Sequence, residues 1–180
     1  MLKPSEKWTW YYDDSTDFLM LDLGEHMIFK TNLERKQLVD CAIGINQFSV
    51  DDASAFHTFK DSLALLPLSE PRQAEFALYG TAAKRFHKPI QPKSWYFDAQ
   101  EEQYDPNDGD IVQLGNHDNS GLFMVLEVGE NASLIAYLGT EPFQLSTSKL
   151  MHFGQAIKVM HDRMQLADLS YSYQSYAMVG

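Results

Sequence analysis

The first thirty residues alternate short apolar runs with turn-forming residues, which is typical of a small antiparallel sheet. Residues 8–12, 18–23 and 27–30 are rich in apolar and aromatic side chains, and polar turn residues separate them. We therefore expect a three-stranded meander. In the first strand Trp8, Trp10 and Tyr12 share one face, so at least two of its aromatic side chains are expected in the core.

Two helix-start signals follow the meander. Thr31 and Glu34 have the spacing of a capping box, in which two side chains satisfy the free amides of a first helical turn. They predict a short helix that ends near Val39. A second signal at residues 49–52 predicts a longer helix over about residues 52–66.

A third helix is predicted to begin at Ser69-Glu70-Pro71, because proline in the first turn loses no amide partner. Its apolar face lies within residues 76–86, and Pro89 ends it soon afterwards. The segment Pro89–Pro92 is the best candidate for a domain joint. We therefore divide the chain into residues 1–90 and residues 91–180.

Beyond the joint the pattern changes to strands. β-rich runs separated by turn residues lie at 95–97, 111–114, 121–128, 133–138 and, as a short one, 143–145. A late helix is predicted over about residues 154–165, with Ile157, Met160 and Met164 on one stripe. The tail at 170–176 alternates serine with tyrosine and predicts either a strand or a loose end. Together these elements indicate an α+β fold.

Composition narrows the functional classes. The chain has 180 residues, a formal net charge of -11 and 44% hydrophobic residues. The negative charge argues against general binding to nucleic acid or to anionic lipid, and no apolar run is long enough to span a bilayer. The N-terminal segment lacks the apolar core of a signal peptide, and there is a single cysteine. We therefore expect a cytoplasmic protein.

The charges are strongly segregated along the chain. Residues 76–97 contain no Asp or Glu, whereas residues 94–148 contain ten acids and no Lys or Arg. One interpretation is a basic patch at the joint that binds an acidic protein surface. The other is a solvated helix end, since cations suit the negative end of a helix dipole. The cations within the acid-free residues 76–97 are Lys84, Arg85, Lys88 and Lys93.

No catalytic centre can be assembled from local motifs. The sequence lacks a glycine-rich phosphate loop, and its six histidines form no metal-binding motif. The acidic stretch 105–110 is a turn by composition, not a calcium loop. Cys41 precedes the apolar residues Ala42 and Ile43, and a lone cysteine in such a setting is more often buried than a catalytic nucleophile. We therefore expect Cys41 to be buried. A small cytosolic enzyme that uses Cys41 nevertheless stays an alternative, as does a binding module for another acidic protein.

Four segments, in order, resemble the ZapC family of Z-ring-associated cell-division proteins. They are KWTWYYDDSTDFLMLDL, KPIQPKSWYF, GENASL and GQAIKVMHDRM, and they extend over nearly the whole chain. The resemblance implies an N-terminal α/β domain and a C-terminal β-barrel-like domain, with no cofactor. It also implies a non-enzymatic protein at mid-cell that binds FtsZ, promotes lateral association of its protofilaments and lowers its GTPase activity.

A site follows from this resemblance taken together with the charge pattern. FtsZ is acidic, so we expect it to approach a cationic face at the joint. The expected protein-binding residues are Lys88 and Lys93, with Lys84 and Arg85 behind them, then Arg163 in the late helix and Leu21 as an apolar candidate. Bundling needs two filament contacts per particle, and we expect a monomer that carries more than one.

Overall fold

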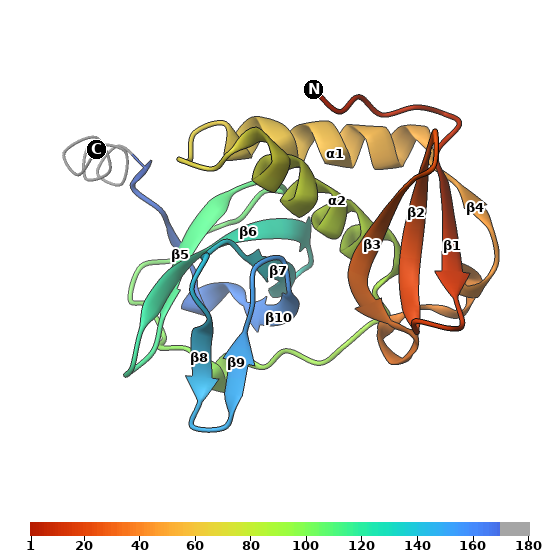
Figure 1. Ribbon diagram of the computed structural model, residues 1–180. Coiled ribbons are helices and arrows are strands. Elements are labelled where there is room, and N and C mark those ends of the chain that lie inside the picture. Colours follow the sequence, from red (N-terminus) through yellow and green to blue (C-terminus); the bar gives the residue numbers. More distant parts are fainter. Residues whose placement is uncertain (170–180) are drawn as a thin grey trace.

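The computed structural model describes residues 1–169, and its first half contains the expected meander. A four-stranded antiparallel sheet has the order β3-β2-β1-β4 (Figure 1). Trp8 and Trp10 are buried, as predicted for two of the four aromatic side chains of this region. The strands are β1 (Thr9–Asp13), β2 (Phe18–Gly24), β3 (Met27–Glu34) and β4 (Asn46–Gln47).

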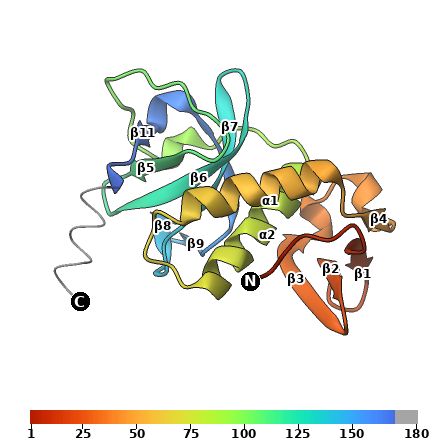
Figure 2. The ribbon, with the colours of Figure 1, turned by 90° about the horizontal axis from the view of Figure 1, so that it is seen from above.

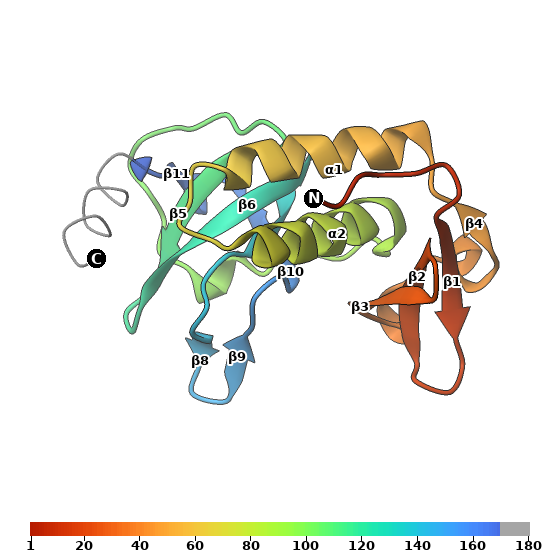
Figure 3. The ribbon, with the colours of Figure 1, turned by 45° about the horizontal axis from the view of Figure 1, so that its top comes forward.

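Two helices follow, and both begin at the predicted caps. Helix α1 (Val50–Leu63) starts after Ser49, whose hydroxyl accepts a hydrogen bond from the Asp52 amide. Helix α2 (Glu70–Phe86) starts after Ser69 and has proline in its first turn. The helices pack side by side, and α2 contacts both β3 and β6 (Ser120–Val128) (Figure 3).

The second half is built from antiparallel strands, and the α+β class is confirmed. A five-stranded sheet has the order β10-β7-β6-β5-β11, and a separate hairpin of β8 and β9 projects from it (Figure 1). The sheet is open, with β10 and β11 at its edges. In addition to β6, the strands of this half are β5 (Ile111–Gly115), β7 (Ala132–Tyr137), β8 (Phe143–Ser146), β9 (Lys149–Met151), β10 (Ala156–Met160) and β11 (Gln165–Leu166).

The late helix predicted over residues 154–165 is wrong. This segment forms strand β10 and then the 3-10 helix η4 (His161–Arg163). The β-branched residues Ile157 and Val159 are two apart and both buried, so the period of two along a strand prevails over the helical stripe.

The short helix predicted over residues 31–39 is also wrong. Strand β3 continues through Glu34, because the Thr31 hydroxyl donates a 2.7 Å hydrogen bond to the Leu19 carbonyl on β2 and does not cap a helix. Two 3-10 helices follow, η1 (Arg35–Gln37) and η2 (Asp40–Ile43).

Two further predictions concern the joint and the tail. The strand expected at residues 95–97 is instead the 3-10 helix η3 (Ser94–Tyr96). The serine- and tyrosine-rich stretch at 170–176 lies outside the described residues.

One hydrophobic core connects the two halves. The larger buried cluster includes Trp10 of β1 and Phe59 of α1, together with Leu126 of β6. At Gly80 of α2 a Cβ atom would lie 3.0 Å from side-chain carbons of both Phe59 and Leu126. Glycine therefore permits the close approach of α2 to α1 and β6. The division between residues 90 and 91 stays a prediction.

The buried carboxylate of Asp52 connects three segments of the first half. Its Oδ2 accepts hydrogen bonds from Trp10 Nε1 of β1 at 3.0 Å and from the Ser49 backbone amide at 2.9 Å. The same oxygen pairs with the Arg85 guanidinium of α2 at 2.5 Å. Asp52 is only 3% exposed, so these groups replace the water that the carboxylate loses on folding.

Replacing Asp52 with alanine should destabilise the fold. We expect Asp52→Ala to lower the free energy of unfolding by about 3 kcal/mol, the lower end for breaking a buried ion pair, because Arg85 is partly exposed and keeps some hydration. Urea titration followed by tryptophan fluorescence measures this loss. The control is Asp51→Ala in the same helical turn, where the side chain is exposed and about 0.5 kcal/mol should be lost. Equal losses in the two variants would contradict this role of Asp52.

Candidate functional site: a basic junction

The segment that joins the two halves is hydrogen-bonded to both. His87 forms an isolated antiparallel bridge with Leu38, and the Lys88 amide donates a 2.8 Å hydrogen bond to the Gln37 carbonyl. At the other end the Lys93 amide donates a 2.8 Å hydrogen bond to the Lys158 carbonyl of β10. The linker therefore passes from the η1 region of the first half to an edge strand of the second. Figure 2 shows the chain crossing from the end of α2 to the second half.

Two cavities border this linker, and cations outnumber acids in their linings. The first has a volume of about 310 Å³ and lies between the β3–η1 segment and strands β9 and β10. The second has a volume of about 350 Å³ and lies between the end of α2 and strands β6 and β7. Their acidic lining residues are Glu34 and Glu127. Their seven cationic lining residues, which we call the basic junction, are Lys36, Lys84, Arg85, Lys88, Lys93, Lys149 and Lys158.

Three cations of the basic junction are paired with carboxylates. Lys84 pairs with Asp108 and donates to the Leu126 carbonyl, so it connects α2 to the second half. Arg85 pairs with the buried Asp52, and Lys36 pairs with Glu34 at 3.5 Å. Lys84 and Arg85 therefore have structural roles, and much of their charge is neutralised within the protein.

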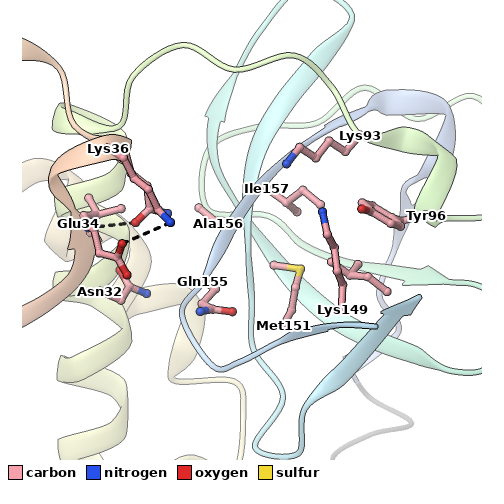
Figure 4. Close-up of a pocket in the computed structure, with 13 residues that line it drawn as sticks. Asn32, Glu34, Lys36, Lys93, Tyr96, Lys149, Met151, Gln155, Ala156 and Ile157 are labelled. Carbon is pink, nitrogen blue, oxygen red and sulfur yellow. Dashed lines mark hydrogen bonds and ion pairs between the residues drawn. The ribbon is translucent and has the colours of Figure 1, made fainter. Parts of the chain in front are cut away.

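The other four cations are available to a partner. Lys88, Lys93, Lys149 and Lys158 form no ion pair with any carboxylate in residues 1–169. In the first cavity Lys93, from the linker, and Lys149, from β9, lie on the second-half side, and Lys36 lies across from them on the first-half side (Figure 4). The Lys149 Nζ lies 5.9 Å from the ring centroid of Tyr96. An anion in this cavity would thus meet several ammonium groups at once.

His87 titrates within the positive field of the basic junction. Burial lowers the pKa of its imidazole, and the charges of Lys88 and Lys93 lower this pKa further. A 2.7 Å hydrogen bond between Nδ1 and the Lys88 carbonyl acts in the opposite direction. The side chain is therefore neutral at pH 7, and a bound anion would favour its protonation.

Arg163 and Leu21 do not line either cavity. Arg163 lies in η4, where its Nε donates to the Ser94 carbonyl at 3.2 Å and its guanidinium pairs with Asp162 at 2.8 Å. It is thus next to Lys93 in space but partly neutralised. Leu21 is fully buried in β2, so it supports the sheet and offers no surface to a partner.

Three lysines of the basic junction were not identified from the sequence. Lys36 lies in η1, Lys149 begins β9 and Lys158 lies in β10. The sequence does contain a signal for Lys149 and Lys158, because both lie in a second stretch without Asp or Glu, residues 142–161. The fold brings this run against the first acid-free run, residues 76–97, through the hydrogen bond between Lys93 and Lys158.

The described residues give little support to catalysis. Cys41 is exposed, so its expected burial is wrong, and in residues 1–169 its sulfur has no hydrogen bond to a histidine or an acid. No three His, Cys, Asp or Glu side chains of this part of the chain gather closely enough to hold a metal ion. Neither helix that the structure describes is long and apolar enough to cross a bilayer.

Comparisons with known proteins cover both halves of the chain. A family model described as cell-division protein ZapC, N-terminal, matches residues 1–88, and one described as cell-division protein ZapC, C-terminal, matches residues 89–169.

Individual relatives carry the same name, cell division protein ZapC. The relative from Vibrio cholerae serotype O1 is 60% identical over 164 residues, which is 91% of each chain. The relative from Vibrio vulnificus is 56% identical over 180 residues and the full length of both chains, and the one from Proteus mirabilis is 34% identical over 166 residues, 91% of this chain and 90% of its own. With both family models matched in order and relatives aligned over nearly the whole chain, the protein belongs to the ZapC family of cell-division proteins.

Proposed function

We propose that the chain binds FtsZ polymers through the basic junction. The observation that carries the proposal is a group of four lysines, Lys88, Lys93, Lys149 and Lys158, that border one linker and form no ion pair within residues 1–169, on a chain of net charge -11. An overall acidic protein repels an acidic partner except where its cations gather, so this surface sets the orientation of the encounter.

Electrostatics alone makes such a contact weak and sensitive to salt. Each exposed ion pair contributes about 0.2–1 kcal/mol, so four lysines together give only modest affinity. A polymer compensates for this weakness, since it repeats the same site and a protein with two contacts remains bound when one opens. Preference for polymeric over monomeric FtsZ follows from this arrangement.

The consequences for the filament require no chemistry from this protein. We propose a non-enzymatic accessory protein of the cytoplasm, located with the Z ring, that works as a monomer with more than one FtsZ contact and without a cofactor. Two contacts per particle join neighbouring protofilaments laterally. Contacts that stabilise the filament must be released for turnover, so GTP hydrolysis by FtsZ slows.

Charge reversal at the linker tests the proposal. We expect Lys88→Glu combined with Lys93→Glu to reduce co-sedimentation with GTP-assembled FtsZ at least tenfold, because two attractions become repulsions. Salt should weaken the parent's binding steeply, since exposed charges are screened within about 8 Å at physiological ionic strength.

A matched control separates the site from net charge. Lys3→Glu with Lys7→Glu makes the same change in charge at two exposed lysines near the N-terminus. This variant should co-sediment and bundle nearly as the parent does. If both double variants bind FtsZ equally, the basic junction is not the FtsZ site.

The pH dependence of binding should report on His87. Its pKa in the free protein lies below the ordinary value of 6.5, and a carboxylate bound beside it would raise that pKa. Binding then takes up a proton, so affinity rises as the pH falls through the pKa of the imidazole in the complex. The measurement is the ratio of affinities at pH 6 and pH 7.5, which should be larger for the parent than for His87→Gln. Equal ratios would place the bound anion away from His87.

Substitution of Cys41 tests whether the protein acts by binding or as an enzyme that uses this thiol. We expect Cys41→Ala to leave co-sedimentation, bundling and GTPase suppression unchanged, because the exposed thiol lies outside the lining of both cavities. Loss of all three effects in a variant that retains the parent's unfolding midpoint would instead favour chemistry at Cys41.

A further inference from the structure

Strand β10 presents one of its two edges to the first cavity. The other edge pairs with β7 in the register Ile157 to Ile135. In an antiparallel ladder alternate residues point their N–H and C=O toward the partner strand, and the residues between them point away. The Gln155 carbonyl and the His161 amide are both bonded toward the β7 side, so the even-numbered residues of β10 face outward.

Several groups along this edge already have partners within the chain. The Gly154 carbonyl accepts a 2.8 Å hydrogen bond from Asn32 Nδ2 of β3. The Lys158 carbonyl accepts from the Lys93 amide at 2.8 Å, and the Met160 amide donates to Ser94 Oγ at 2.9 Å. The linker thus already covers one end of the edge, and β3 covers the other.

Between these two covers lies Ala156, the residue of β10 whose amide and carbonyl both lack a partner within residues 1–169. Its amide and carbonyl point away from β7, and no residue in 1–169 supplies a hydrogen bond to either. Ala156 also lines the first cavity (Figure 4). A strand rises about 3.3 Å per residue, so the gap from Gly154 to Lys158 is about 13 Å long, enough for a short extended segment.

The surroundings of this gap indicate what such a segment carries. Lys93 and Lys149, which form no ion pair within residues 1–169, lie on the second-half side of the cavity, and Lys36, paired with Glu34, lies across from them (Figure 4). Apolar side chains of Met151 and Ile157 also line it. A segment with a carboxylate beside an apolar side chain matches both features, whereas a basic segment would be repelled.

We propose that an extended acidic segment of the FtsZ polymer adds to β10 as a short strand, with Ala156 exchanging backbone hydrogen bonds with it. The inference rests on the proposed function, because it specifies how the same partner is held. Backbone hydrogen bonds fix the segment's direction and register, and the lysines select for its charge. The docking is therefore directional, which charge attraction alone does not provide.

Amide exchange tests the hydrogen bond directly in the parent protein. Hydrogen–deuterium exchange of the Ala156 amide should slow at least tenfold when GTP-assembled FtsZ is added, since the amide gains a partner. The Gln113 amide on β5, far along the sheet, serves as reference and should not change. Unchanged exchange at Ala156 in the bound protein would overturn the proposal.

A backbone substitution gives the second test. Ala156 is the first residue of an edge strand and its amide faces away from the ladder, a position at which proline is tolerated. Ala156→Pro removes the donor and places a ring where the added strand would lie, so we expect co-sedimentation to weaken about tenfold. Ala156→Ser retains the amide, so its co-sedimentation should weaken clearly less than that of Ala156→Pro.

The outcomes separate the two proposals. If charge reversal at Lys88 and Lys93 weakens binding while folded Ala156→Pro binds as the parent does, the basic junction stands and strand addition is wrong. If the parent itself fails to sediment with FtsZ polymers, the proposed function fails and this inference fails with it. Should Ala156→Pro not fold, as judged by circular dichroism, the exchange measurement decides alone.

Discussion

The carboxylate of Asp52 is the contact on which the arrangement of the first half depends. A single oxygen of this buried side chain accepts from Trp10, from the Ser49 amide and from Arg85, so it joins β1, the start of α1 and the end of α2. Removing a carboxylate from water is costly unless donors surround it, and here three do. The end of α2 thereby obtains a fixed position, and the linker begins directly after it.

The position of α2 in turn determines the basic junction. Because α2 packs against both α1 and β6, with Gly80 at the closest approach, the two halves share a core. The linker leaves α2 at His87 and reaches β10 at Lys93, so cations from both halves meet along it. Lys84 and Arg85 are paired at the base of this arrangement, and this leaves the outer lysines to interact with a partner.

A shared junction differs from two independent binding surfaces. Lys36 and Lys93 belong to different halves but line one cavity, so the cavity exists only while the halves keep their relative position. The open edge of β10 has the same dependence, since β3 and the linker cover its two ends and leave Ala156 between them. Charge and strand geometry thus converge at one place on the molecule, which is where both proposals locate FtsZ.

The sequence by itself determined the meander, the caps of α1 and α2, most strands of the second half and the family, because these depend on local patterns and short sequence motifs. It also located Lys88 and Lys93 through the acid-free run. It could not place Lys149 and Lys158 beside them, since only tertiary packing brings the second acid-free run to the linker. It misassigned β10 as a helix because Ile157, Met160 and Met164 also fit a helical stripe, and pairing with β7 decided the outcome. Burial of Leu21 and exposure of Cys41 were likewise decided by packing, as an apolar neighbourhood in sequence does not specify which face meets the core.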